Sequence, residues 1–188
     1  MTVAGLLMAA GRSRRFGEAN KLLAIFEGRP LVTHAASRLR AVTDNQLAVV
    51  RSREVAAVLP FGYEIIVSDK PSAGFGDNIA KGAALAKHQQ ANKLLITLGD
   101  MPKISGLHLR QLISAAGANL PAATCWAGRA VVPACFPAAW FDRLIACHGE
   151  RGASFLINEL PKDQLLPVNT LQYIDVDTPE DLLGNNSQ

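Results

Sequence analysis

The chain has 188 residues, only three of which are cysteines, and it contains no long uninterrupted hydrophobic run. Cys125, Cys135 and Cys147 form an odd set without metal-site spacing, and an oxidising compartment would leave one thiol unpaired. We therefore expect reduced thiols and a cytoplasmic location. No stretch reaches the roughly 18 apolar residues of a membrane span, and no charged region precedes the first apolar run. We expect no membrane association.

The chain also carries little excess charge. The net charge is +3, and the basic residues are scattered except for Arg12, Arg14 and Arg15, so no groove for a nucleic-acid backbone is indicated. A small anionic ligand fits this distribution better. No Ser/His/Asp or Cys/His arrangement suggests a nucleophile, and His34 and His148 fit packing or capping roles as well as functional ones.

What the chain does have is apolar residues. The hydrophobic fraction of 49% and the charged fraction of 19% suit a packed α/β protein, and the length suits a single domain over residues 1–188. Apolar runs alternate with helical patterns: strands are expected at 3–9, 46–50, 63–67 and 93–98, and helices at 30–42, 78–90 and 108–118. This alternation predicts βαβ units, with a mostly parallel sheet and helices on both faces.

The second half is less regular. Residues 122–136 predict two strands around Gly128, and Pro133 and Pro137 are expected to limit any strand there to an edge or an end. Further elements are expected as helices at 138–147 and 153–159, a strand at 171–176 and a final helix from about Pro179.

The run GLLMAAGRSRRFGEANKLL, residues 5–23, places glycines and cations directly after the first strand. Gly11 and Gly17 allow backbone amides to approach a phosphate chain, and Arg14, Arg15 and Lys21 supply charge. A solvated basic loop would have the same composition. The run is neither a Walker loop nor a G-x-G-x-x-G motif.

Two acidic positions follow apolar runs. Asp100, in LITLGDMP, lies where a doubly wound sheet exposes functional side chains, although a cap or turn residue would have the same setting. Asp175 and Asp177, in YIDVDTPEDL, alternate along an expected strand, and Asp177 is also placed to cap the next helix. A third loop, 68–85, is either a connector or a ligand loop.

The opening run, its continuation KLLAIFEGRPLVTH and the LGDMP stretch together resemble the MobA-like nucleotidyltransferases, most closely the MocA-type molybdenum cofactor cytidylyltransferases. Phe16 replaces the usual methionine, and the spacing from Gly17 to Lys21 is one residue longer than in the family. The resemblance implies a three-layer αβα fold with a mostly parallel, Rossmann-like sheet of the nucleotide-diphospho-sugar transferase type.

The resemblance also implies roles for individual residues. Asp100 and Asp177 would be the Mg²⁺ ligands, Asp175 being less favoured, and Arg15, Lys21 and Asp100 would be catalytic. Asn78 stands where relatives have serine. The implied nucleotide-binding residues are Ala9, Ala10, Gly11, Arg12, Arg14, Arg15, Lys21, Pro71, Gly74 and Asn78.

The implied reaction transfers CMP from CTP to the phosphate of molybdopterin, with release of pyrophosphate. Guanylyl-transferring relatives usually open L-A-G-G, whereas this chain has Ala9 and Ala10 before Gly11, which favours CTP over GTP. The enzymatic alternatives are a GTP-using molybdenum cofactor guanylyltransferase and a sugar-phosphate nucleotidyltransferase.

Near the acceptor segment, Gly149 and Gly152 match the family, but Glu150 and Ser154 replace its Asp and Arg. With Asn78, these departures motivate an alternative of another class: a non-catalytic protein that binds the molybdenum cofactor and delivers it. In either case the expected partner is a molybdoenzyme or its chaperone.

Overall fold

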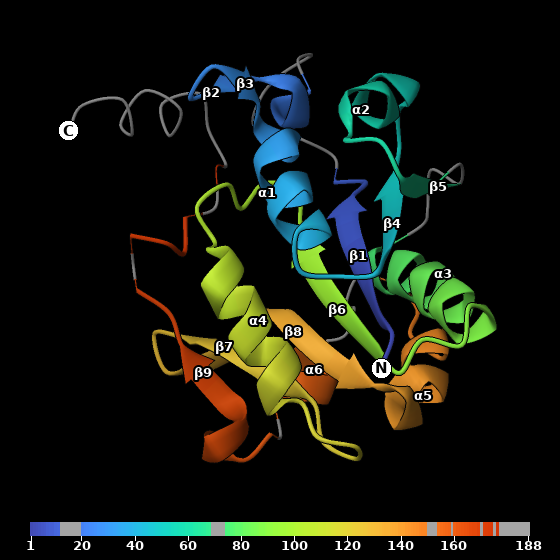
Figure 1. The fold of residues 1–188 in the computed structure, drawn as a ribbon, viewed down its shortest axis with the longest axis vertical. Helices are drawn as coiled ribbons and strands as arrows, with labels where there is room; N and C mark the ends of the chain where they lie inside the picture. The colour runs from blue at the N-terminus through green and yellow to red at the C-terminus, as the bar shows by residue number, and fades with distance from the viewer. Residues whose placement is uncertain are drawn as a thin grey trace.

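A seven-stranded sheet forms the centre of the molecule, with strand order β5-β4-β1-β6-β8-β7-β9 (Figure 1). The structure is a computed structural model, and it describes residues 1–11, 20–68, 74–149, 154–158, 160–169, 171–174 and 176. The strands of the sheet are β1 (Val3–Ala9), β4 (Asn45–Val50), β5 (Tyr63–Val67), β6 (Lys93–Leu98), β7 (Ala122–Trp126), β8 (Arg129–Pro137) and β9 (Leu165–Pro167). Only β8 runs against the other six, so the predicted mostly parallel sheet is confirmed.

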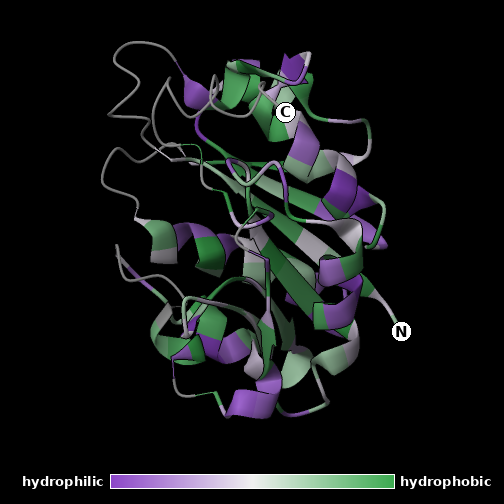
Figure 2. Ribbon diagram, turned by 90° about the vertical axis from the view of Figure 1, so that its left-hand side faces the viewer, coloured by the Kyte–Doolittle hydropathy of each residue, from purple (hydrophilic) through white to green (hydrophobic). Residues whose placement is uncertain are grey.

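Helices cover both faces of the sheet, as the sequence predicted. The helices are α1 (Leu31–Arg40), α2 (Arg53–Val58), α3 (Phe75–His88), α4 (Gly106–Ala115), α5 (Phe141–Ile145) and α6 (Ser154–Ile157). Leu6 of β1 packs into one apolar cluster with α3, α5 and α6, whereas its neighbour Leu7 packs into a second cluster with α1, α2 and α4. Successive strand residues therefore bury their side chains on opposite faces, and Figure 2 shows the apolar strands enclosed between helices that carry polar outer faces.

Short elements complete the chain. A hairpin of β2 (Ile25–Phe26) and β3 (Arg29–Pro30) precedes α1, and single turns of 3-10 helix occur at η2 (Lys21–Leu23), η3 (Ala138–Trp140) and η4 (Lys162–Gln164). Side-chain caps begin two of the helices: Ser52 accepts from the backbone N–H of Val55, and Ser105 accepts from that of His108.

The expectation for Pro133 is wrong. Its strand, β8, is an inner strand between β6 and β7. Pro133 fits there because the pairing shifts from Ala123↔Ala134 to Thr124↔Val131, and because the ladder with β6 ends at Ala134. A bulge removes the demand for a backbone N–H at this position, so an inner strand can contain the proline.

The strand expected at 171–176 is also wrong for the described residues. Residues 171–174 and 176 lie outside any strand, and the β9 strand pairs with the free edge of β7 instead. Tyr173 stacks on Trp126, with ring centroids 4.9 Å apart, so this segment packs through its side chains. The helix expected near Pro179 lies outside the described residues.

Candidate active site

The carboxyl ends of β1 and β6 lie side by side in the sheet, with Met8 paired to Leu98. Gly99 continues this pairing, because its N–H donates to the carbonyl of Met8 at 3.0 Å. A Cβ on Gly99 would come within 3.2 Å of Val32 and 3.4 Å of Leu22. The missing side chain thus lets the turn that holds Asp100 pack closely against the end of β1.

Lys21 and Asp100 meet at this edge. The Nζ of Lys21 lies 2.7 Å from Oδ2 of Asp100, and the two side chains are 10% and 18% exposed. Lys21 begins the η2 turn, which Asn20 caps by accepting a hydrogen bond from the N–H of Leu22. The structure therefore joins the basic loop after the first strand to the acidic end of a neighbouring strand.

The second oxygen of Asp100 has a different environment. Oδ1 is buried and has no hydrogen-bond partner. A buried carboxylate oxygen without a partner is unfavourable, and a cation or donor bound there would satisfy it. Oδ2 of Asp100 is thus paired with Lys21, whereas Oδ1 is available to a ligand.

The chain near the C-terminus also reaches Asp100. The backbone N–H of Val176 donates to the carbonyl of Asp100 at 3.3 Å. Val176 is fully buried in a small cluster with Phe26 and Leu31. Val176, which stands between Asp175 and Asp177 in the sequence, therefore lies at the same sheet edge as Asp100.

A second group of polar atoms lies where β5 ends and α3 begins. Gly74 is the N-cap residue of α3, and Asn78, in its first turns, is 3% exposed. Oδ1 of Asn78 and Oγ of Ser68 are both buried without a hydrogen-bond partner. Sequence reasoning missed Ser68, although its position directly after a strand is the signal that identified Asp100.

Ala9, Ala10 and Gly11 lie at the end of β1 as predicted, and a Cβ on Gly11 would meet no atom within 4 Å. The packing of the described chain therefore does not require glycine at position 11. Sequence reasoning also missed Arg51, which follows β4 and donates through Nε to the carbonyl of Ala10 at 3.2 Å. A cation directly after a buried strand was the available signal.

The predicted site also includes residues beyond the described part of the chain. Arg12, Arg14, Arg15, Pro71, Asp175 and Asp177 lie outside the described residues. Within the described part of the chain, no group of three or more His, Cys, Asp or Glu side chains gathers as a metal site. Among the described residues at this edge, Asp100 has a carboxylate oxygen that could ligate a metal, and Mg²⁺ is commonly held by only one or two carboxylates.

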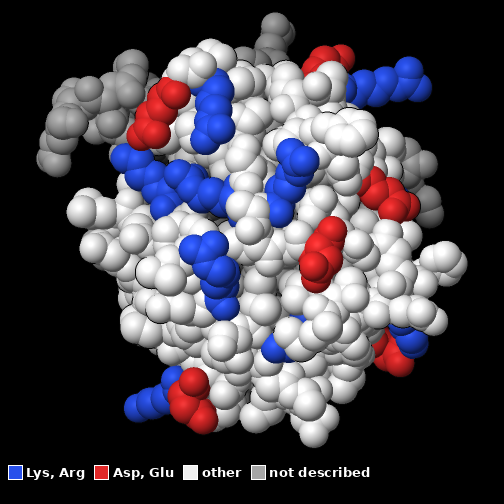
Figure 3. Space-filling model, viewed as in Figure 1, with Lys and Arg blue, Asp and Glu red and all other residues white. Residues whose placement is uncertain are grey.

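A basic group lies beside the site, at the hairpin before α1. Lys and Arg side chains concentrate over this part of the molecule (Figure 3). The group consists of Arg29, Arg38 and Lys103. Nη1 of Arg38 is buried and has no hydrogen-bond partner, and Nζ of Lys103 lies 3.9 Å from Oε1 of Glu27. Burial and the neighbouring Arg29 lower the pKa of Arg38. These residues are dispersed in the sequence, so composition alone did not reveal the group.

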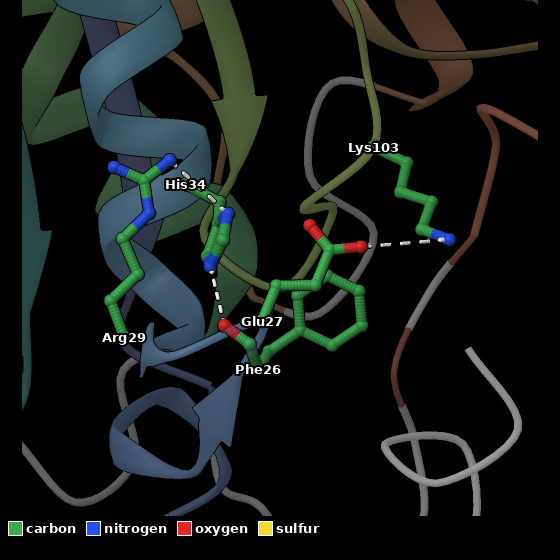
Figure 4. Close-up of polar contacts among 5 residues, drawn as sticks. All are labelled: Phe26, Glu27, Arg29, His34 and Lys103. Carbon is green, nitrogen blue, oxygen red and sulfur yellow. Dashed lines mark hydrogen bonds and ion pairs between the residues drawn. The ribbon is translucent and has the colours of Figure 1, made fainter. Parts of the chain in front are cut away.

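His34 has a structural role within this group. Its Nε2 donates to the carbonyl of Phe26 at 2.8 Å, and its Nδ1 accepts from Arg29 at 3.3 Å (Figure 4). Burial lowers the pKa of His34. The neutral imidazole thus connects the hairpin to α1, which agrees with the packing interpretation. His148 is exposed.

The family model described as the MobA-like NTP transferase domain matches residues 5–165. The chain belongs to this family. It is therefore a nucleotidyltransferase of the MobA-like type, and the sheet edge that holds Lys21 and Asp100 is part of a nucleotidyltransferase fold. Among the described helices, none has the length and apolarity to cross a bilayer.

Individual relatives agree with this membership. The nucleotidyltransferase is 28% identical to the molybdenum cofactor guanylyltransferase of Pseudomonas fluorescens, over 97% of this chain and 92% of the relative. Its fold matches that of Rv0371c from Mycobacterium tuberculosis in complex with manganese, with a TM-score of 0.79 and 22% identity over 98% and 97% of the two chains. A nucleotidyl transferase from Methanothermobacter gives a TM-score of 0.82 at 18% identity over 98% and 95%.

Proposed function

We propose that this nucleotidyltransferase transfers CMP from CTP to the phosphate of a molybdopterin-type acceptor, with Mg²⁺, as a single domain over residues 1–188. The observation that carries the proposal is the Lys21–Asp100 pair at the carboxyl edge of β1 and β6, with Nζ 2.7 Å from Oδ2. A cation for phosphates and a carboxylate for a metal are the two charges that nucleotidyl transfer needs. The product would pass to a molybdoenzyme or its chaperone in the cytoplasm.

In the proposed reaction, an oxygen of the acceptor phosphate forms a bond to the α-phosphorus of CTP, and the bond from that phosphorus to the bridging oxygen of the β-phosphate breaks. The attacking oxygen is already anionic near neutral pH, so no general base is needed, and positioning with charge neutralisation dominates. Arg15 and Lys21 offset the charge that develops on pyrophosphate.

The nucleotide is held by two loops in this proposal. Ala9, Ala10 and Gly11 lead into the basic loop of Arg12, Arg14 and Arg15, and the open space at Gly11 supports close approach of a phosphate chain. Pro71 and Gly74 precede α3 and belong to the second loop, and Asn78 follows in the first turns of α3, where its unpartnered Oδ1 supports a contact with the ligand. The basic group of Arg29, Arg38 and Lys103 attracts polyanions toward this edge.

Asp100 and Asp177 hold the metal in the proposal. The buried, unpartnered Oδ1 of Asp100 fits a hard cation, and the contact of Val176 with the carbonyl of Asp100 supports Asp177 as the second ligand. When bound, Mg²⁺ would polarise the phosphates and stabilise the leaving group. The manganese in the related Rv0371c structure supports a divalent ion of this class.

A GTP-using guanylyltransferase is the second candidate, favoured by the name of the Pseudomonas fluorescens relative. Ala9 and Ala10 before Gly11 favour CTP. The test is turnover of the purified protein with Mg²⁺, molybdopterin and each of CTP, UTP, ATP and GTP. We expect release of pyrophosphate with CTP, and turnover with GTP alone would reject the cytidylyl assignment.

Asp100→Ala and Lys21→Ala test the site itself. Each variant should lose at least about 100-fold in turnover, because Asp100→Ala removes a carboxylate that would hold the metal and Lys21→Ala removes a cation that offsets charge on the phosphates. The matched controls are Asp142→Ala and Lys87→Ala, which break a second Lys–Asp pair whose side chains are 79% and 53% exposed. A cofactor carrier would keep its delivery activity in Asp100→Ala, so that result would favour the non-catalytic alternative.

A further inference from the structure

Two segments far apart in the sequence touch backbone to backbone where α3 begins. The N–H of Gly76 donates to the carbonyl of Gly149 at 2.7 Å. A Cβ on Gly76 would lie 2.8 Å from the carbonyl carbon and oxygen of His148, so only glycine fits without moving the backbone. The two segments are thus held closer together than side chains would allow.

Asp77 binds both segments with one oxygen. Its Oδ2 accepts the N–H of Gly74 at 2.7 Å and the N–H of Gly149 at 3.2 Å. The bond to Gly74 is the usual one for an acidic residue in the first turn of a helix. The bond to Gly149 is additional, because that residue belongs to the chain after α5. The hydrogen bond from Gly74, followed by that from Gly149, lowers the pKa of Asp77.

We propose that Asp77 is a positioning residue that fixes the nucleotide-side loop, which ends at Gly74 before α3, relative to the acceptor-side segment, which begins at Gly149 after α5. This inference rests on the proposed function. Transfer requires the α-phosphorus of the nucleotide and the acceptor oxygen to be held at a fixed separation. Because the Asp77 carboxylate binds both Gly74 and Gly149, it sets the spacing between the two segments proposed to bind these groups.

A second Asp provides a matched control. Asp142 of α5 pairs with Lys87 near the far end of α3, so it also connects α3 to α5. These two helices lie side by side at the right of Figure 1. Asp142→Ala therefore removes an α3–α5 contact without touching Gly74 or Gly149, whereas Asp77→Ala removes the contact at the junction. Asp77→Asn keeps an acceptor oxygen and should rescue most of the loss.

The experiment measures KM for nucleotide and for acceptor, together with amide hydrogen exchange in the full-length protein. Asp77→Ala should raise both KM values roughly tenfold and should speed exchange at Gly74 and Gly149 together. Asp77→Asn should lie near the wild type, and Asp142→Ala should match it. Unchanged KM values in a folded Asp77→Ala protein, or equal losses in Asp142→Ala, would overturn the proposal.

The exchange measurement separates this proposal from the proposed function. If the wild type transfers no nucleotide, the proposed function fails, and exchange still reports whether Asp77 joins the two segments. Unchanged exchange at Gly149 in Asp77→Ala overturns the positioning role whatever the substrate is. Faster exchange at Gly149 alongside normal exchange in Asp142→Ala supports the role.

Discussion

Lys93 shows how a charged residue can serve the fold. Lys93 is the first residue of β6 and is only 9% exposed. Its Nζ donates to the carbonyls of Ile113 and Ala116 at 2.6 and 2.5 Å. These carbonyls belong to the end of α4, where a helix leaves carbonyl groups without intrahelical partners. The cation thus joins the sheet to a helix terminus.

We expect Lys93→Met to lower the free energy of unfolding by roughly 1–3 kcal/mol, since it removes the donor from two carbonyls at the end of α4, one of them in a buried bond. Urea unfolding followed by circular dichroism measures this loss. Lys87→Met, at an exposed ion pair, should change stability by less than about 0.5 kcal/mol. A Lys93→Met protein as stable as the wild type would show that water replaces the ammonium group at no cost.

At the scale of elements, His108 joins α4 to β7. Its Nε2 donates to Oγ1 of Thr124 at 2.8 Å, and this hydroxyl donates to the carbonyl of Pro133 at 2.7 Å. Nε2 of His108 therefore carries a proton in this network, and the burial of the ring favours its neutral form. Burial lowers the pKa of His108 from its ordinary value of 6.5.

Stability should therefore fall as the pH drops below about 6.5, because the unfolded chain then binds a proton that folded His108 excludes. Above that pH both states are neutral and the contribution is complete. Comparing urea midpoints at pH 7.5 and 5.5 tests this: His108→Gln should reduce the difference, and His88→Gln, at an exposed position, should not. Some dependence should remain from His34, whose pKa is also lowered.

Gly82 sets the distance between α3 and β1. A Cβ there would lie 2.4 Å from Cδ2 of Leu6, which is fully buried. We expect Gly82→Ala to cost about 1–3 kcal/mol by overpacking, despite the better helix propensity of alanine. Gly106→Ala in α4 is the control, since its Cβ would meet nothing closer than 3.7 Å.

Differential scanning calorimetry of these variants measures the loss. The Gly82→Ala/Leu6→Ala double variant should lose less than the sum of the single variants, because the smaller side chain makes room for the new methyl group. Strict additivity would contradict the proposed clash.

Elements were predicted well where the burial pattern was local. β1, β5 and β6 have the expected bounds. In β1 and β6 a mostly apolar run specifies a buried strand without reference to neighbours, and β5 has the expected bounds although it is a partly exposed edge strand. The run at 171–176 has similar local character, yet β9 occupies the free edge of β7. Which segment pairs with the exposed backbone groups of β7 depends on the tertiary structure, so a local sequence pattern cannot predict it.

At the scale of the whole molecule, the chain near its C-terminus contacts the sheet edge beside the proposed metal ligand Asp100. Val176 is fully buried against Phe26 and Leu31, and its N–H donates to Asp100. We expect Val176→Ala to loosen this contact and to raise, several-fold, the Mg²⁺ concentration needed for half-maximal turnover.

Leu31→Ala serves as the control for that prediction, because it opens the same cluster from the α1 side. It should lower thermal stability at least as much while leaving the Mg²⁺ requirement nearer the wild type. Titration of turnover with Mg²⁺ measures both variants. An unchanged Mg²⁺ requirement in Val176→Ala would argue that Asp177 does not bind the metal.

The amino-acid sequence by itself determined the alternation of strands and helices and the chemistry available after each strand, because both depend on residue type and short spacing. The family resemblance already implied that Lys21 and Asp100 share a site. Tertiary structure alone decided that the two form a direct ion pair, that Asp77 reaches Gly149, and that β8 lies inside the sheet. The physical reason is that long-range pairing is selected by packing the whole sheet against its helices. That choice minimises unpaired backbone groups and buried voids across the molecule, so it belongs to no single segment.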